Sequence, residues 1–141
     1  VPGYLIKLDV RTNRPVGRAL VDRSPGDIIL SADGRLAFVS HYDLARFRDQ
    51  LTKGSPAIEG YSAIIIVDAE RMQVLSTTPM CPTAHGMGLS KDERLLYATC
   101  SLSDQLAVVE ISDPSKPVVR PLVPIGPAAN TTGNPAYAPY A

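Results

Sequence analysis

The chain has 141 residues, enough for one ordinary domain, and its 14 basic side chains balance its 14 acidic ones. That balance leaves no basic stripe for nucleic acid and no polybasic segment for an anionic membrane. The longest strongly apolar run, residues 63–67, is too short to cross a bilayer. We therefore expect no nucleic-acid partner and no membrane span.

The composition favours strands. Thirteen Pro and ten Gly residues are typical of many short strands joined by turns. Apolar or alternating segments predict ten strands, at residues 4–9, 15–21, 26–31, 35–41, 62–68, 73–79, 85–90, 94–100, 106–111 and 118–123. Between the fourth and fifth strands, Leu44, Phe47 and Leu51 have helical spacing, so residues 44–54 are predicted to form a short amphipathic helix. The alternative is an ordered loop anchored by Phe47.

The two ends of the chain have no features of natural termini. The first ten residues, VPGYLIKLDV, contain no initiator Met and neither the charged nor the apolar region of a signal peptide. We expect the natural N-terminus, and any export signal, to lie outside this chain.

Part of the chain repeats with a tight polar turn at its centre. Residues 26–43 align with residues 85–102 at an offset of 59. Both read as an apolar strand, Leu-Ser, a turn containing Asp33 or Asp92, then Arg and a second strand. These two Asp residues are predicted to bond the turn backbone.

A second set of segments, 4–21, 63–80 and 106–123, also repeats, each as a strand ending in an acid, a turn and another strand. The first offset in this set is 59 and the second is 42. An insertion at about 45–61 explains the difference, because its removal makes the first offset equal to the second. A second insertion, at about 126–138, restores the same spacing near the end of the chain. The underlying period is about 42 residues, which lies in the range of known structural repeats.

A period near 42 with four short strands per unit is typical of a β-propeller blade. We therefore predict an all-β fold in which residues 1–141 form a partial propeller of four-stranded antiparallel blades. The strand at 15–21 is expected to be the innermost of its blade, followed by 26–31, 35–41 and 62–68.

The hairpin phrase LSADGRLAFVSHYD, together with the closing strands AIIIVD and LAVVEI, resembles the YVTN family of bacterial β-propellers. The family motif runs approximately SPDGxxxYVTN, and here His41 and Cys100 stand where that motif has Asn. The resemblance implies an exported protein, periplasmic or extracellular, and a closed ring of about seven blades. Ten strands make only two and a half blades.

An incomplete ring would expose apolar faces and unpaired strand edges. We therefore expect that the isolated chain is not a stable monomer. Its expected partners are the remaining blades of the same propeller or a second chain that completes the ring.

Alternate connections of an antiparallel blade lie on the same face, which locates the unusual residues. Both insertions fall on one face, and the connections on the opposite face are short turns. Loops on a rigid scaffold commonly bind ligands. The predicted binding face contains the ends of three strands, with candidate residues His41, Tyr42, Asp43, His85 and Tyr140.

The two cysteines, Cys81 and Cys100, lie at the open end of one hairpin. If Ser90 faces Arg94 across the turn, Cys100 faces Ala84, and Cys81 lies three residues further along. A bend at Pro82 would bring the two Cα atoms within the limit of about 7 Å for a disulfide. Unpaired structural thiols and a metal or redox role remain as alternatives, although no C-x-x-C motif is present.

The two histidines, His41 and His85, allow three roles. The resemblance implies copper ligation as one of them, because related propellers hold copper through histidines on successive blades. Lining of a binding site and structural packing are the others. Ser40, His41 and Asp43 are not predicted to form a catalytic triad, because adjacent strand residues point to opposite faces.

These patterns favour an exported scaffold that binds ligands or proteins through the predicted binding face. The rival is the propeller portion of a periplasmic oxidoreductase, either copper-dependent or similar to the propeller subunits of amine dehydrogenases. No catalytic residue is assigned.

Overall fold

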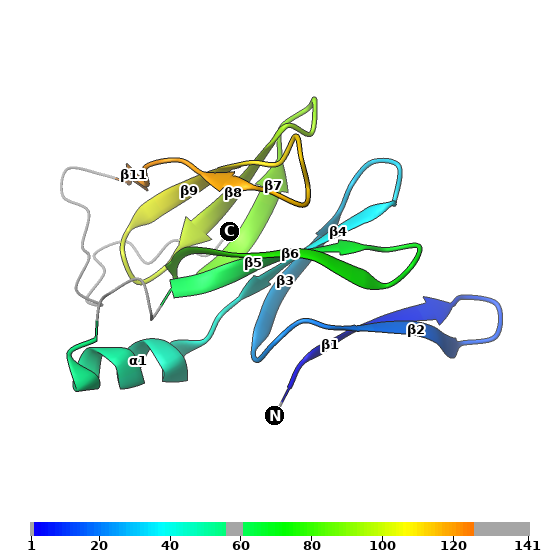
Figure 1. Ribbon diagram of the computed structural model, residues 1–141, viewed down its shortest axis with the longest axis horizontal. Helices are drawn as coiled ribbons and strands as arrows, with labels where there is room; N and C mark the ends of the chain where they lie inside the picture. Colours follow the sequence, from blue (N-terminus) through cyan, green and yellow to red (C-terminus); the bar gives the residue numbers. More distant parts are fainter. Residues whose placement is uncertain (1, 56–60, 126–141) are drawn as a thin grey trace.

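A computed structural model describes residues 2–55 and 61–125. The described part is all-β, with several antiparallel sheets and one ten-residue helix (Figure 1). The strands are β1 (Tyr4–Asp9), β2 (Arg14–Leu20), β3 (Pro25–Leu30), β4 (Leu36–His41), β5 (Tyr61–Asp68), β6 (Gln73–Pro82), β7 (Ala84–Leu89), β8 (Leu95–Cys100), β9 (Gln105–Glu110), β10 (Val118–Val119) and β11 (Val123–Pro124). The helix is α1 (Leu44–Lys53). Within the described residues, no helix has the length and hydrophobicity needed to span a membrane.

The first nine predicted strands are confirmed, most of them within one residue of the predicted bounds. The tenth, predicted at 118–123, is two short strands that both pair with β9. Pro117 and Pro121 flank β10, and proline has no N–H to donate to a strand ladder. The ladder along β9 is therefore interrupted.

The grouping of strands into sheets differs from the prediction by one strand. The strand predicted as the innermost of its unit, β2, pairs with β1 before it and not with β3. Likewise, β6 pairs with β5 along its whole length, so the middle sheet has the order β3-β4-β5-β6. The cause is the short turn between Asp68 and Gln73, which makes β5 and β6 a hairpin. Each sheet begins one strand later than predicted, and this change is the same in every unit. The predicted assignment of connections to the two ends of the sheets is therefore unchanged.

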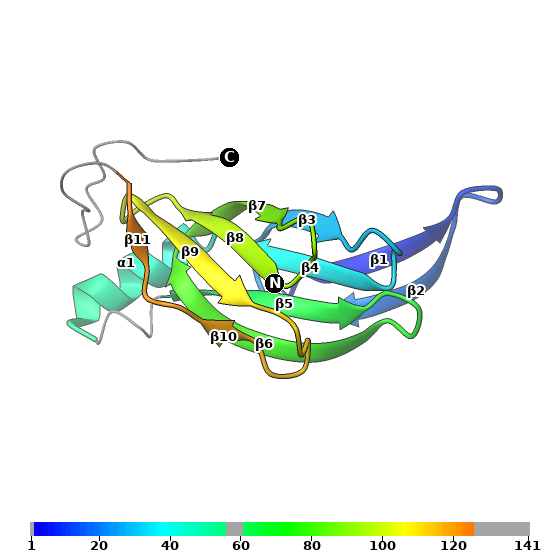
Figure 2. The same cartoon turned by 90° about the horizontal axis from the view of Figure 1, so that it is seen from above.

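Within the middle sheet, β5 is buried on both faces, which explains its continuous apolar run. Ile64 and Ile66 point into a core shared with β7, β8 and β9. Ile65 and Val67 point the other way, into a smaller core that includes Ala19 from β2. Successive sheets therefore stack face to face, with β7–β9 on one side of the middle sheet and β1–β2 on the other (Figure 1), and they overlap when seen from above (Figure 2).

Candidate binding face

The two ends of the sheets differ in construction. At one end, each turn contains an Asp whose carboxylate accepts hydrogen bonds from backbone N–H groups of the same turn. These residues are Asp9, Asp33, Asp68, Asp92 and Asp113. The prediction that Asp33 and Asp92 are turn residues is confirmed. This end is closed by short, internally bonded turns.

In four of these turns the hydrogen bonds also lower the pKa of the carboxyl group, at Asp33, Asp68, Asp92 and Asp113. The backbone N–H of Arg35 and the Ser31 hydroxyl donate to Asp33, and they lower its pKa to about 2. The backbone N–H of Arg71 lowers the pKa of Asp68 in the same way. These four turns are therefore held by ionised carboxylates.

The opposite end contains α1, the β6–β7 connection and the loop after β8 (Figure 1). Asp43 begins the helix by accepting a hydrogen bond of 2.9 Å from the Arg46 N–H, and it also pairs with the Arg23 guanidinium at 3.3 Å. Gly54 ends the helix in the left-handed conformation. Asp43, a predicted site residue, is thus the N-cap of α1 and is largely buried.

Phe47 is the buried side chain of the helix, at 3% exposure, whereas Leu51 is 48% exposed. The predicted apolar face of Leu44, Phe47 and Leu51 is therefore only partly used. The remaining faces of α1 are available to line a surface.

A charged groove lies between α1 and the β2–β3 connection. Its volume is about 380 Å³. The lining residues are Asp22, Arg23, Ala45, Arg46, Asp49 and Gln50. Two cationic and two anionic side chains thus face one hollow, which suits a ligand carrying both charges.

His41 is buried at 3% exposure and bridges three parts of the chain. Its Nδ1 lies 2.9 Å from the Ala63 carbonyl oxygen of β5, and its Nε2 contacts the Val21 carbonyl oxygen after β2. Both ring nitrogens thus face carbonyl oxygens, and neither is directed toward a metal site. His41 does not fit the role of a copper ligand in this arrangement.

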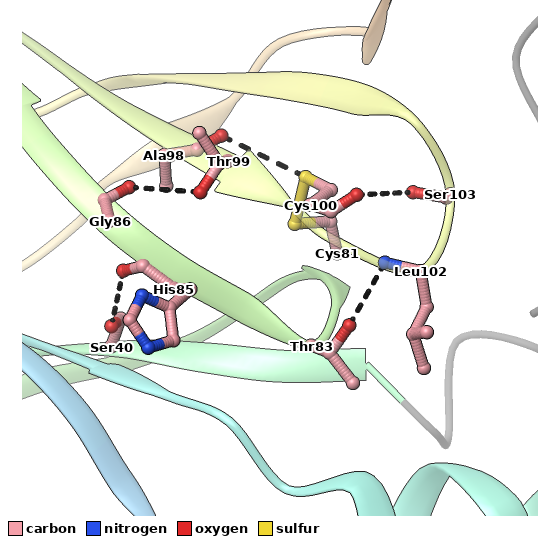
Figure 3. Close-up of a disulfide and its surroundings, with 10 residues drawn as sticks. All are labelled: Ser40, Cys81, Thr83, His85, Gly86, Ala98, Thr99, Cys100, Leu102 and Ser103. Carbon is pink, nitrogen blue, oxygen red and sulfur yellow. Dashed lines mark hydrogen bonds between the residues drawn. A yellow bond between two sulfur atoms is a disulfide. The ribbon is translucent and has the colours of Figure 1, made fainter. Parts of the chain in front are cut away.

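Ser40 and His41 engage different neighbours, as the strand alternation predicts. The Ser40 hydroxyl donates to the His85 carbonyl oxygen at 2.8 Å, toward β7 (Figure 3). The imidazole ring of His85 meets the Tyr42 ring edge to face, with centroids 5.2 Å apart. Of the predicted histidine and aromatic residues, the structure therefore brings Tyr42 and His85 together. The predicted site residue Tyr140 lies outside the described residues.

Cys81 and Cys100 form a disulfide, with Cα atoms 5.8 Å apart and both residues fully buried (Figure 3). Cys100 pairs with Ala84, as the predicted register requires. The bend lies at Thr83, whose φ is +48°, one residue after the predicted Pro82. The bond joins β6 of the middle sheet to β8 of the next sheet. Among the described residues, no group of three His, Cys, Asp or Glu side chains is placed to hold a metal ion.

The sequence did not reveal a buried polar loop beside the disulfide. Ser101, Ser103 and Asp104 are almost fully buried although they follow β8 directly. Thr83 holds this loop, because its Oγ1 accepts a hydrogen bond from the Leu102 N–H at 3.2 Å (Figure 3). Only the burial of these polar side chains distinguishes this loop from an ordinary surface connection, and burial cannot be seen in the sequence.

The fold defines an all-β protein of several antiparallel sheets. No protein-family model matches the chain, and no curated protein matches it. Among solved structures, the chain is similar in fold to the hydrazine synthase of Kuenenia stuttgartiensis, with a TM-score of 0.57 and 18% sequence identity. The match covers 85% of this chain and 30% of the hydrazine synthase chain, so this chain spans less than a third of the length of that chain. At this identity the similarity concerns the fold alone.

Proposed function

We propose that the chain is part of an exported β-propeller of the YVTN type that binds a ligand or protein partner through the end containing α1. Sheets of up to five strands stacked face to face, with hairpins that repeat in sequence, support the propeller. The buried disulfide supports an oxidising compartment such as the periplasm or the exterior of the cell. The fold similarity to part of a solved structure is compatible with this architecture.

One observation carries the binding proposal, namely the contrast between the two ends of the sheets. The turn end is closed by short turns whose carboxylates are occupied by their own backbone. The helix end holds the long insertion, the N-cap at Asp43 and the charged groove beside α1. A rigid sheet stack that presents a helix and a charged groove at one end is suited to recognition.

The rival function, an oxidoreductase with copper or an amine dehydrogenase-like role, has no specific observation in its favour among the described residues. His41 engages two carbonyl oxygens, and the sulfurs of Cys81 and Cys100 are bonded to each other. We therefore give priority to binding.

The test is an NMR screen of the ¹⁵N-labelled chain with a library of short peptides that each carry one positive and one negative charge. We expect chemical-shift changes to concentrate at residues 22–24 and 44–50. The substitution Arg46→Ala should weaken binding at least tenfold, because Arg46 lines the groove. Arg94→Ala, an exposed cation in a turn at the opposite end, serves as the matched control and should leave binding unchanged. Shift changes centred on the turn end, or equal effects of both substitutions, would refute the proposal.

A further inference from the structure

An apolar groove runs between the edge of β1 and the face of β3 and β4. Its volume is about 410 Å³. Its walls include Leu5, Ile6 and Lys7 of β1 together with Ile28, Leu30 and Ala37 of the middle sheet. Ile28 and Leu30 are 50% and 57% exposed, which is unusual for large apolar side chains on adjacent positions of one sheet face.

The next sheet shows what normally covers these positions. Met87 and Leu89 occupy the same repeat positions as Ile28 and Leu30, in the following unit of the sequence. Both are partly buried and pack against the core that the middle sheet supplies. The cover comes from β3 and β4, since both strands contact β7. Among residues 2–55 and 61–125, the first sheet consists of β1 and β2 alone, so this part of the chain places no such cover over Ile28 and Leu30.

The outer edge of β1 lies next to the same groove. β1 occupies the repeat position of β5 and β9. β5 pairs with the hairpin strand β4, and β9 pairs with the hairpin strand β8. Within the described residues β1 pairs with β2 only, so its other edge has no strand beside it. An open edge is a template for strand addition.

We propose that this groove is a docking site for a β-hairpin with the sequence pattern of residues 25–42, which adds to the edge of β1 and covers Ile28 and Leu30. The register follows from the middle sheet, in which Ala37 lies opposite Val67 and Val39 lies opposite Ile65. Transferred by the repeat, the docked hairpin places the residues equivalent to Ala37 and Val39 opposite Leu8 and Ile6. The inference rests on the repeated arrangement behind the proposed function, but it does not involve the α1 end.

The probe is a fluorescein-labelled peptide with the sequence of residues 25–42, titrated with the 141-residue chain at low micromolar concentration and followed by anisotropy. We expect saturable binding with one peptide per chain, and no binding of a scrambled peptide. The double substitution Ile28→Asp with Leu30→Asp should weaken binding at least tenfold, because it places two carboxylates in the apolar groove. Val16→Asp is the matched control, since Val16 is 59% exposed on β2 and does not line the groove.

Cross-linking tests the register. A peptide carrying Val39→Cys should form a disulfide with the chain carrying Ile6→Cys, and not with the chain carrying Lys7→Cys, because a slip of one residue turns each side chain to the other face. The native cysteines are bonded to each other and buried, so they do not compete.

Three results would overturn the proposal. The first is absence of saturable binding by the peptide, and the second is cross-linking at position 7 in preference to position 6. The third is a dimer of the wild-type chain that fails to bind peptide and dissociates on the double substitution, since it would make a second copy the occupant. None of these results affects the peptide screen at the α1 end, so the two proposals fail separately.

Discussion

Removal of the Cys81–Cys100 bond is predicted to destabilise the stack locally. The two cysteines are 19 positions apart in the sequence. A disulfide that closes a loop of that size adds about 3 kcal/mol to the free energy of unfolding by restricting the unfolded chain. Because a change of about 1.4 kcal/mol corresponds to a factor of ten, this contribution is roughly a 150-fold change in an opening equilibrium. The effect should be greatest where the bond joins β6 to β8.

The assay is amide hydrogen exchange of the native chain, before and after reduction. We expect the buried amides of Leu96 and Ala98 in β8 to exchange roughly 100-fold faster in the reduced chain. The variant Cys81→Ala with Cys100→Ala should show at least the same increase and no further change with reductant. Reduced wild type keeps both sulfur atoms, so the comparison separates the covalent bond from the packing of the sulfurs.

The β1–β2 hairpin provides the internal control, since it packs on the other face of the middle sheet and lies outside the disulfide loop. Its amides should exchange at the same rate in oxidised and reduced chains. An increase below tenfold in β8, or an equal increase in β1 and β2, would refute the reasoning.

Three further outcomes are expected. Phe47→Ala should remove the buried contact of α1, at a cost of about 3 kcal/mol, and deprotect the helix amides in hydrogen exchange while the β8 amides keep their protection. The lowered pKa of Asp33 contributes stability above pH 4 that is lost as pH falls toward about 2, so Asp33→Asn should flatten the acid side of a plot of melting temperature against pH. Because Ile6 and Leu8 on β1 are more than half exposed, the isolated chain should be only marginally stable and melt over a broad range, and a sharp two-state transition of a monomer would contradict this expectation.

The strands were predictable because their pattern is local. Alternation of apolar residues and turns with Asp determines where each strand begins and ends, and most bounds agree with the structure within one residue. Which strand begins each sheet was not predictable in the same way, because a repeating sequence does not show where one structural unit ends and the next begins. The short turn that makes β5 and β6 a hairpin decided it.

The candidate site was predictable to the extent that it depends on register. The alignment of Ala84 with Cys100 led to the disulfide, and strand alternation separated Ser40 from His41. The partners of His41 come from β5 and from the segment after β2, which lie in two different sheets. Contacts between sheets depend on stacking, and the sequence of one strand does not specify them.

The position of the disulfide gives the molecule an unequal response to tension. Cys81 lies at the end of β6 and Cys100 ends β8, so the segment between them, with the whole of β7, is bypassed when the chain is pulled from its two ends. A segment of that size spans roughly 65 Å when extended, and this length is not released until the bond is broken. The β1–β2 hairpin has no such tether. The segment after Cys100, with β9 to β11, also lies outside the bond, so force applied to the two ends would first unfold the parts on either side of the loop while Cys81 and Cys100 keep the ends of β6 and β8 together.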